Sequence, residues 1–249
     1  MCIRDRGEDA VCGNLDKHVF FLNVPTGGGK TNLSMRLALR IMEKLNTKKI
    51  FYVFPFINII EQAYESLEKY VPPDTEGLSR CIRLDSKAPV VSGTRSDDLT
   101  DEALKEISLS LSFMNYPVLF LSNVKFFDLF FRNDKGANYN FYHLANSIVI
   151  LDEIQSYDDK LWTLLAEILF KSARALNMYV IVMSATLPRL NELIRSENEK
   201  MGVQEDISLC EVFDEGTRKE IFSHPCFNRC RYDFSFLKKK YCLPLTAKK

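Results

Sequence analysis

Short apolar runs alternate along the chain with longer segments in which apolar residues recur at helical spacing. The runs predict buried strands, and the longer segments predict helices. The predicted strands are residues 18–23, 49–54, 118–121, 147–151, 179–183 and 207–213. The predicted helices are residues 32–45, 58–70, 100–114, 124–131, 161–178 and 188–197. This alternation indicates an α/β domain with a mostly parallel sheet and helices on both of its faces.

Three stretches show neither continuous apolar runs nor helical spacing of apolar residues, and they are predicted to be irregular. One has little periodicity, one is polar and one is rich in turn-forming residues. They are residues 1–17, 74–99 and 133–140. Asn58, and the pair Ser122 and Asn123, stand where the N-caps of the following helices are expected.

The composition is that of an ordinary globular protein, with 46% hydrophobic and 27% charged residues. The formal net charge is zero, so any contact with nucleic acid must be local to a groove. No apolar run approaches the roughly 20 residues of a membrane span, and the N-terminus lacks the layout of a signal peptide. We therefore predict a cytoplasmic protein without a membrane partner. We divide it into an N-terminal segment without assigned structure (1–17), one α/β domain (18–217) and a C-terminal extension (218–249).

Seven cysteines, an odd number scattered along the chain, favour reduced thiols over a disulfide framework. Four residues near the C-terminus could ligate zinc: His224, Cys226, Cys230 and Cys242. Their spacing lacks the Cys-x-x-Cys pair of a zinc knuckle, so we favour free thiols and keep zinc as the alternative.

A glycine-rich turn between the first predicted strand and the first predicted helix carries the strongest chemical signal. It reads Val24, Pro25, Thr26, Gly27, Gly28, Gly29, Lys30 and Thr31. Glycines let backbone N–H groups surround phosphate oxygens without Cβ clashes, and the helix N-terminus adds further donors. We predict that residues 26–31 bind nucleotide phosphates, with Lys30 on the β- and γ-phosphates and Thr31 on Mg²⁺. The strict pattern has glycine in place of Val24, and the alternative is a flexible turn without a ligand.

Two acidic residues follow the predicted strand 147–151, and ligands bind at the carboxyl ends of parallel strands. Adjacent carboxylates are costly to bury unless they serve a cation or a proton transfer. We predict that Asp152 holds Mg²⁺ and that Glu153 orients and deprotonates an attacking water. The alternative is an acidic helix N-cap.

A third segment, Ser184, Ala185 and Thr186, follows the predicted strand 179–183. Its hydroxyl groups can hydrogen-bond the acidic segment of a neighbouring strand. A Ser/Thr turn before a helix that starts at Pro188 is the alternative, and it would be preferred if this segment stood alone.

In this order the three segments resemble superfamily 2 helicases, which carry a Walker A loop, a DEx-type Walker B segment and a Ser-Ala-Thr motif. Within that superfamily the sequence most resembles the CRISPR-associated helicase–nuclease of type I interference systems. The closer resemblance rests on residues 23–31, 51–62, 123–127, 145–155 and 183–188. It implies a RecA-like P-loop fold and ATP with Mg²⁺ as cofactors. It also implies that Lys30, Asp152, Glu153 and Gln155 are catalytic, and that Gln155, Ser184, Ala185 and Thr186 couple hydrolysis to strand movement.

The resemblance also implies that single-stranded DNA lies along two further segments. These comprise Pro55, Phe56, Asn58, Asn123 and Lys125. Each segment lies where a predicted strand gives way to a helix, so free backbone N–H groups can face phosphates. For Phe54 and Phe56 we favour packing in the core over stacking on bases.

Two parts of such an enzyme have no counterpart in the sequence. None of the three histidines forms the adjacent His-Asp pair of the nuclease, and no Gln-x-x-Gly-Arg-x-x-Arg string of a second motor domain follows Thr186. The arginines of that string complete the ATP site and are worth ~10³–10⁵ in rate, so this chain alone is expected to hydrolyse ATP feebly. No glutamine precedes the phosphate loop to recognise adenine.

These features predict the first motor domain of an ATP-driven helicase that translocates on single-stranded DNA. In the intact protein, the resemblance implies a second motor domain, recruitment to a crRNA-guided surveillance complex and degradation of invading DNA. The alternatives are a generic superfamily 2 DNA or RNA helicase, including restriction-type translocases, and an adaptor that binds ATP and strands without turnover. A truncated, inert product is the remaining interpretation.

Overall fold

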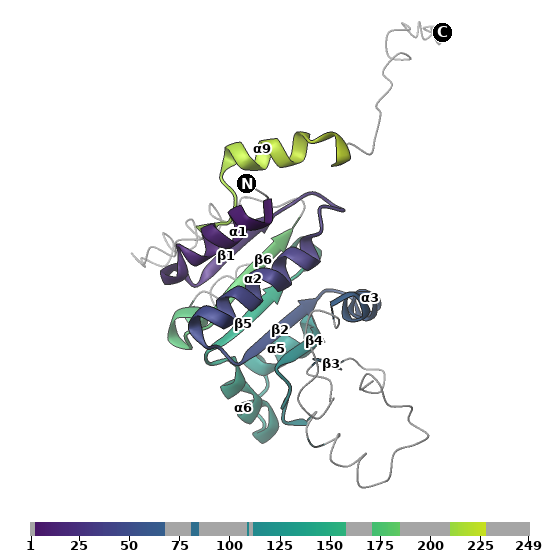
Figure 1. The fold of residues 1–249 in the computed structure, drawn as a ribbon. Helices are drawn as coiled ribbons and strands as arrows, with labels where there is room; N and C mark the ends of the chain where they lie inside the picture. The colour runs from purple at the N-terminus through teal and green to yellow at the C-terminus, as the bar shows by residue number, and fades with distance from the viewer. Residues whose placement is uncertain are drawn as a thin grey trace, which may run out of the picture.

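The computed structural model describes residues 3–67, 81–84, 109, 112–157, 171–184 and 210–227. They contain a seven-stranded sheet in the order β3-β4-β2-β5-β6-β1-β7, in which all neighbouring strands are parallel (Figure 1). The strands are β1 Val19–Asn23, β2 Lys49–Phe54, β3 Cys81–Leu84, β4 Val118–Ser122, β5 Ser147–Leu151, β6 Tyr179–Ser184 and β7 Cys210–Glu211. The predicted α/β class is confirmed.

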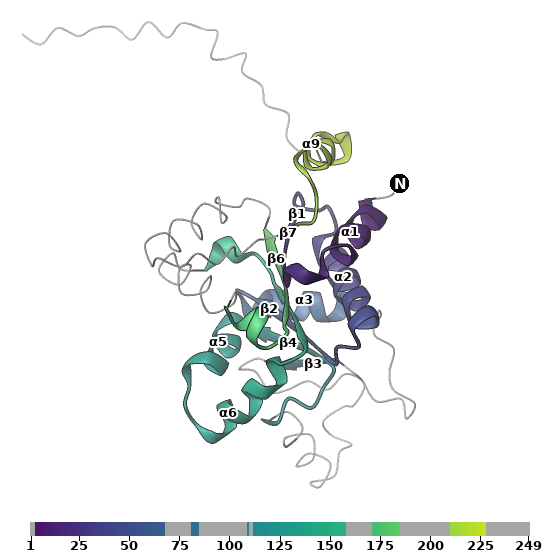
Figure 2. The same ribbon diagram turned by 90° about the vertical axis from the view of Figure 1, so that its left-hand side faces the viewer.

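Helices cover both faces of this sheet, with α1, α2 and α3 over one face and α5 and α6 over the other (Figure 2). In the described residues the α-helices are α1 Ile3–Cys12, α2 Lys30–Leu45, α3 Ile57–Leu67, α5 Asn123–Phe131, α6 Lys135–Phe141 and α9 Glu215–Ser223. The 3₁₀ helices are η1 Leu15–Lys17, η4 Tyr142–Leu144, η5 Ile154–Ser156 and η6 Pro225–Phe227.

The strands supply two separate cores, because successive side chains of a strand point to opposite faces of the sheet. In β2, Ile50, Tyr52 and Phe54 pack beneath α2 and α3. Phe51 and Val53 pack on the face that α5 covers. All five side chains are fully buried. A strand covered on both faces has no polar positions to alternate with apolar ones, which explains the continuous apolar runs in the sequence.

The N-terminal segment is more regular than predicted, because Ile3–Cys12 forms α1. This helix packs on α2: Val11 is fully buried, and Glu8 forms ion pairs with Arg36 and Arg40. The segment has weak periodicity because most of its residues are polar. The partners that stabilise it lie on α2, so local sequence does not reveal the helix.

The polar stretch 74–99 also contains an element that was not predicted, the strand β3. Its residues pair with β4 at the edge of the sheet, and Arg83 of this strand forms an ion pair with Glu61. A four-residue strand that includes an arginine gives little hydrophobic signal of its own.

The helix starts confirm one predicted N-cap and overturn another. Ser122 caps α5 by accepting a hydrogen bond from the backbone N–H of Lys125 at 3.4 Å. In contrast, α3 begins at Ile57, so Asn58 lies within its first turn and is not its N-cap. The loop predicted at 133–140 is largely the helix α6, which Asp134 caps.

The remaining predicted elements are described only in part. The segment that precedes β6 is helical at residues 171–175 and turns at 176–177, so this helix ends before Met178. Within the predicted strand 207–213, only Cys210–Glu211 is a strand among the described residues. The predicted helix 188–197 and most of 100–114 lie outside the described residues, and α9 crosses the predicted boundary at 217/218. No helix in the described part of the chain is both long and apolar enough to cross a membrane.

Candidate active site

The glycine-rich loop after β1 has a backbone that only glycines adopt without strain. Gly27 and Gly29 have φ values of 78° and 74°, in the left-handed region. A Cβ on Gly28 would lie 2.6 Å from Cγ1 of Val24 and 3.0 Å from the carbonyl oxygen of Pro25. The loop therefore folds tightly on itself before α2 begins at Lys30.

Lys30 connects this loop to the end of β5. Its Nζ lies 2.8 Å from Oε1 of Glu153, and its side chain is buried. The contact is possible because β5 and β1 flank β6, so their carboxyl ends lie at the same edge of the parallel sheet. Two segments 123 residues apart in the sequence thus meet at this edge.

The backbone after β5 is strained at Glu153. This residue has a φ of 44°, in the left-handed region that residues with a Cβ seldom adopt. Two hydrogen bonds from backbone N–H groups hold this segment. The N–H of Asp152 donates to the carbonyl of Val53 at 2.9 Å. The N–H of Glu153 donates to Oδ1 of Asp152 at 2.8 Å.

A chain of hydrogen bonds continues from Glu153 to β6. The side-chain amide of Gln155 donates to Oε2 of Glu153. The hydroxyl of Ser184 donates to Oε1 of Gln155 at 2.5 Å. The described part of the site therefore links Lys30, Glu153, Gln155 and Ser184 in one continuous set of contacts. Ala185 and Thr186, predicted to act with Ser184, lie outside the described residues.

The two carboxyl groups differ in acidity. Burial raises the pKa of Asp152 to about 6, and the nearby charge of Glu153 adds to the rise. Burial also opposes the charged form of Glu153, but hydrogen bonds from Lys30 and Gln155 outweigh it and lower its pKa. Such opposed shifts in adjacent groups are typical of functional sites. A cation beside Asp152 would offset the effect of its burial.

The residues at this edge fit a magnesium nucleotide. The folded glycine loop leaves backbone N–H groups at a helix N-terminus, which suits phosphate. The carboxylate of Asp152 and the hydroxyl of Thr31 are hard oxygen donors of the kind that Mg²⁺ prefers. Thr31 follows Lys30 in the first turn of α2.

The predicted nucleic-acid residues lie at the same edge: Pro55 and Phe56 between β2 and α3, Asn58 in the first turn of α3, and Asn123 and Lys125 in the first turn of α5. The strands β2 and β4 are neighbours in the sheet, so the segments that follow them are adjacent. Asn58 and Lys125 are exposed. Phe54 is fully buried, as predicted, but the expectation of core packing is wrong for Phe56, which is 56% exposed.

The zinc candidates are only partly described. The structure includes His224 and Cys226, whose contact is a backbone hydrogen bond from Cys226 to the ring of His224 at 3.3 Å. Cys230 and Cys242 lie outside the described residues, and the described part of the chain contains no cluster of three or more metal-binding side chains.

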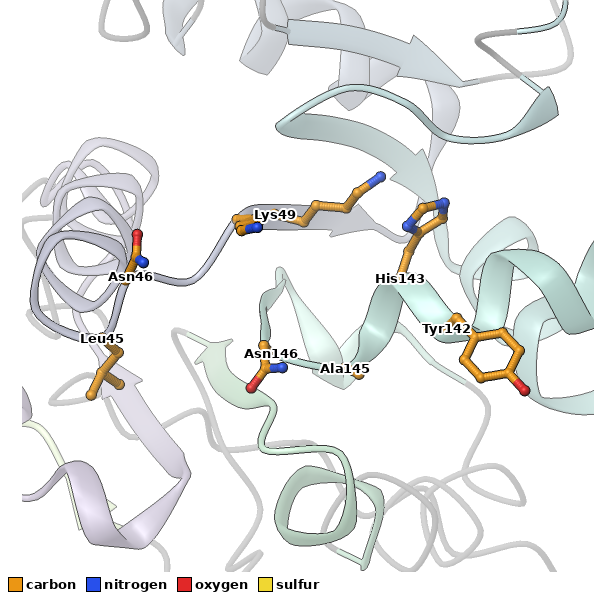
Figure 3. Close-up of a pocket in the computed structure, with 8 residues that line it drawn as sticks. Leu45, Asn46, Lys49, Tyr142, His143, Ala145 and Asn146 are labelled. Atoms are coloured by element: carbon orange, nitrogen blue, oxygen red, sulfur yellow. The ribbon is translucent and has the colours of Figure 1, made fainter.

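A pocket of about 340 Å³ lies at the opposite edge of the sheet, where the strands begin (Figure 3). The end of α2, the start of β2 and the segment before β5 line it, and the side chain of Lys49 extends toward His143. Burial lowers the pKa of Lys49 to about 8. None of the predicted site residues lines this pocket.

Two residues near the phosphate loop were not recognised from the sequence. Tyr52 lies in the middle of β2, and its hydroxyl is 3.0 Å from that of Ser34 in α2. Both side chains are fully buried. A tyrosine in an apolar strand is ordinarily a core residue, and only the three-dimensional contact reveals its polar role.

Comparisons with known proteins relate the chain to one family. Residues 8–193 match the family model of the DEAD/DEAH box helicases. No curated protein sequence matches the chain. Among solved structures, the chain is similar to the Hef helicase domain of Pyrococcus furiosus, with 16% sequence identity and a TM-score of 0.47. The similarity covers 80% of this chain and 36% of that structure, so the chain spans well under half of its length.

Proposed function

The chain belongs to the DEAD/DEAH box helicase family, with an α/β, RecA-like fold, and we propose that it is a motor domain that binds and hydrolyses ATP. The observation that carries the proposal is the continuous set of contacts from Lys30 through Glu153 and Gln155 to Ser184. It joins the phosphate loop, the acidic segment and β6 at one edge of the sheet. These parts are needed to bind phosphate, to activate water and to transmit the change in the acidic segment to β6.

In this proposal, the N–H groups of residues 26–31 bind the phosphates, and Thr31 and Asp152 hold Mg²⁺. The bound metal ion would neutralise charge on the β- and γ-phosphates. Lys30 exchanges its contact with Glu153 for the phosphates, which leaves Glu153 free to accept a proton from water. While Lys30 contacts it, Glu153 is held as a carboxylate with a lowered pKa; loss of that contact removes a main cause of the lowering, so the carboxylate becomes a stronger base.

Gln155 and Ser184 would transmit movements of the acidic segment to β6 through their hydrogen bonds. Gln155 accepts from Ser184 and donates to Glu153, so a movement of Glu153 changes both hydrogen bonds. We propose that Ser184, Ala185 and Thr186 pass this change to the segment that follows β6, as the resemblance to helicases implies.

We further propose that nucleic acid lies across the segments that follow β2 and β4. Asn58 and Lys125 are exposed there, and the N-terminus of α3 can contribute backbone N–H groups to phosphates. Because Phe56 is exposed, its ring is available to stack on a base. Pro55 and Asn123 complete this surface.

More specifically, we propose that the substrate is single-stranded DNA and that the protein acts in CRISPR type I interference. The amino-acid sequence of residues 51–62 and 145–155, which resembles the CRISPR-associated helicase–nuclease, supports this proposal. The second motor domain and the crRNA-guided surveillance complex belong to the same proposal. CRISPR arrays and surveillance-complex genes beside the coding sequence would support it, whereas restriction genes there would favour a restriction-type translocase.

The ATP site is tested by titrating the purified chain with a fluorescent ATP analogue in the presence of Mg²⁺. Lys30→Ala removes a charged donor, so the dissociation constant is expected to rise by roughly 10- to 100-fold. Lys44→Ala, in the last turn of the same helix, is the matched control and is expected to bind like the wild type. Equal binding by wild type and Lys30→Ala, or no binding by the wild type, would contradict the proposal.

A further inference from the structure

The pocket at the start of β2 is lined by a half-buried lysine, Lys49, and by its exposed neighbour Lys48. Nζ of Lys49 donates to the carbonyl oxygen of Met114, which uses one of the three protons of the ammonium group. No carboxylate of the described residues forms an ion pair with either lysine. Charges that leave water are normally paired, so the contact with Met114 does not fully explain a cation at this position.

A second polar group beside Lys49 also lacks a partner among the described residues. Nε2 of His143 is buried and forms no hydrogen bond with them. Figure 3 shows the side chain of Lys49 extending toward this ring. Burial and the charge of Lys49 lower the pKa of His143, so the ring is uncharged at neutral pH and the lysines supply the positive charge of the pocket.

The described wall of the pocket offers hydrogen-bond donors to a ligand and contains no carboxylate that would repel an anion. In Asn146, Oδ1 accepts from Nδ2 of Asn177 at 2.8 Å, which leaves the NH₂ group of Asn146 as a donor. One feature opposes an anion: α2 ends at Leu45, and the carbonyl end of a helix acts as about half a negative charge. The two full positive charges of the lysines outweigh it.

We propose that this pocket binds a small anion that carries a phosphate or carboxylate group. The oxygen atoms of that group accept hydrogen bonds from Lys48 and Lys49, and such bonds between charged partners are the strong ones. The volume of about 340 Å³ is that of a small-molecule site. The pocket lies where the strands begin, whereas the proposed ATP site lies where they end, so the inference does not depend on the proposed function.

The test is acylation of the folded chain with a water-soluble acetylating reagent, followed by mass spectrometry of its peptides. The probes are inorganic phosphate and citrate, each compared with sodium chloride at the same ionic strength. Only the uncharged amine reacts, and a bound anion favours the charged form by about one pKa unit or more. We therefore expect a saturating probe to slow acylation of Lys48 and Lys49 roughly tenfold. Lys44, an exposed lysine of α2 that does not line the pocket, is expected to react at the same rate throughout.

The two probes distinguish the sources of the anionic group. Protection by phosphate alone identifies a phosphate ligand, protection by citrate alone identifies a carboxylate, and protection by both supports either group. No protection of Lys48 and Lys49 by either probe, or equal protection of Lys44, overturns the inference. The same peptides report Lys30, so a phosphate effect at the proposed ATP site is measured separately and each conclusion can fail alone.

Asn146→Asp tests the pocket with an internal anion. Aspartate keeps the acceptor for Asn177 and places a carboxylate in the wall that the lysines share, so it is expected to abolish protection by the probe. Asn133→Asp is the matched control: Oδ1 of this exposed residue also accepts from an asparagine, Asn138, at 3.2 Å, but it does not line the pocket. It is expected to keep the protection. Thermal unfolding checks that both variants fold, and protection that persists in folded Asn146→Asp overturns the inference. If that variant does not fold, the wild-type rates decide.

Discussion

Two adjacent carboxyl groups at the end of β5 have pKa values shifted in opposite directions. Asp152 is buried beside Glu153 and has a raised pKa. Glu153 keeps contacts with Lys30 and Gln155 and has a lowered one. Neutralising either group is therefore expected to change stability, but with opposite signs.

We predict that Asp152→Asn stabilises the ligand-free chain at pH 8. The pKa of Asp152 in the folded chain is about 6, above the ordinary value of 3.8, so the folded state binds its proton more tightly. The charged carboxylate therefore destabilises the fold above pH 6, by about 3 kcal/mol at most, and this penalty fades as the pH falls through 6 toward 4. Denaturant unfolding at pH 8 and pH 4 measures the difference.

Glu153→Gln is the matched comparison for that experiment. The pKa of Glu153 in the folded chain is lowered from its ordinary value of 4.5. The charged carboxylate therefore stabilises the fold at pH values above 4.5, and this stabilisation is lost as the pH falls through the pKa of the folded state. The substitution is expected to destabilise the chain at pH 8. A loss of stability at pH 8 in Asp152→Asn would contradict the interpretation of the pair.

At this scale, the sequence indicates the residues of the phosphate loop and the acidic pair, because their types and spacing are tied to their chemistry. It does not indicate Tyr52, which stands in an apolar strand, or Ser34, which stands in a helix. The contact between their hydroxyl groups joins two elements and cannot be recognised from either local sequence. It also misplaces Phe56, because the end of β2 could be foreseen but not the direction of a side chain just beyond it.

Among the elements, the loop between β1 and α2 leaves no room for a side chain at Gly28. We predict that Gly28→Ala destabilises the chain by about 1–3 kcal/mol and weakens binding of the ATP analogue. Its Cβ would lie 2.6 Å from Val24 and 3.0 Å from the backbone of Pro25, so the loop must open. Thermal unfolding and nucleotide titration measure the two effects.

Gly216→Ala, in the first turn of α9, is the control for that substitution. The nearest atom to its Cβ would be Oδ1 of Asp214 at 3.5 Å, an ordinary contact, and alanine favours helix. It is expected to leave stability unchanged or slightly higher. Equal effects of the two substitutions would show that the loop has more room than its geometry indicates.

Elements are predictable from the sequence where local periodicity and burial agree. The inner strands and α2 meet this condition, since each has a continuous or regularly spaced apolar pattern. α1, β3 and α6 do not, because an ion-paired helix face, a four-residue edge strand and an N-cap at Asp134 stabilise them. Their stability comes from particular contacts and not from a repeating pattern.

At the scale of the whole molecule, the proposed ATP site lies at the carboxyl ends of β1, β5 and β6. We predict that phosphate release by this chain alone is slow and that a second motor domain, supplied in trans or fused, accelerates it by ~10³-fold or more. Single-stranded DNA is expected to stimulate the combined protein, and Glu153→Gln to abolish the stimulation. Measured phosphate release that DNA never stimulates would favour the ATP-binding adaptor.

Within residues 3–67, 81–84, 109, 112–157, 171–184 and 210–227, the two outermost strands of the sheet are its shortest. β3 has four residues and β7 has two, whereas the strands between them have five or six. A short border strand exposes few unpaired N–H and C=O groups, so another polypeptide gains little by adding to it. The long strands that carry the phosphate loop and the acidic pair have neighbours on both sides. Their position protects the most apolar, aggregation-prone sequence of the chain from edge-to-edge association.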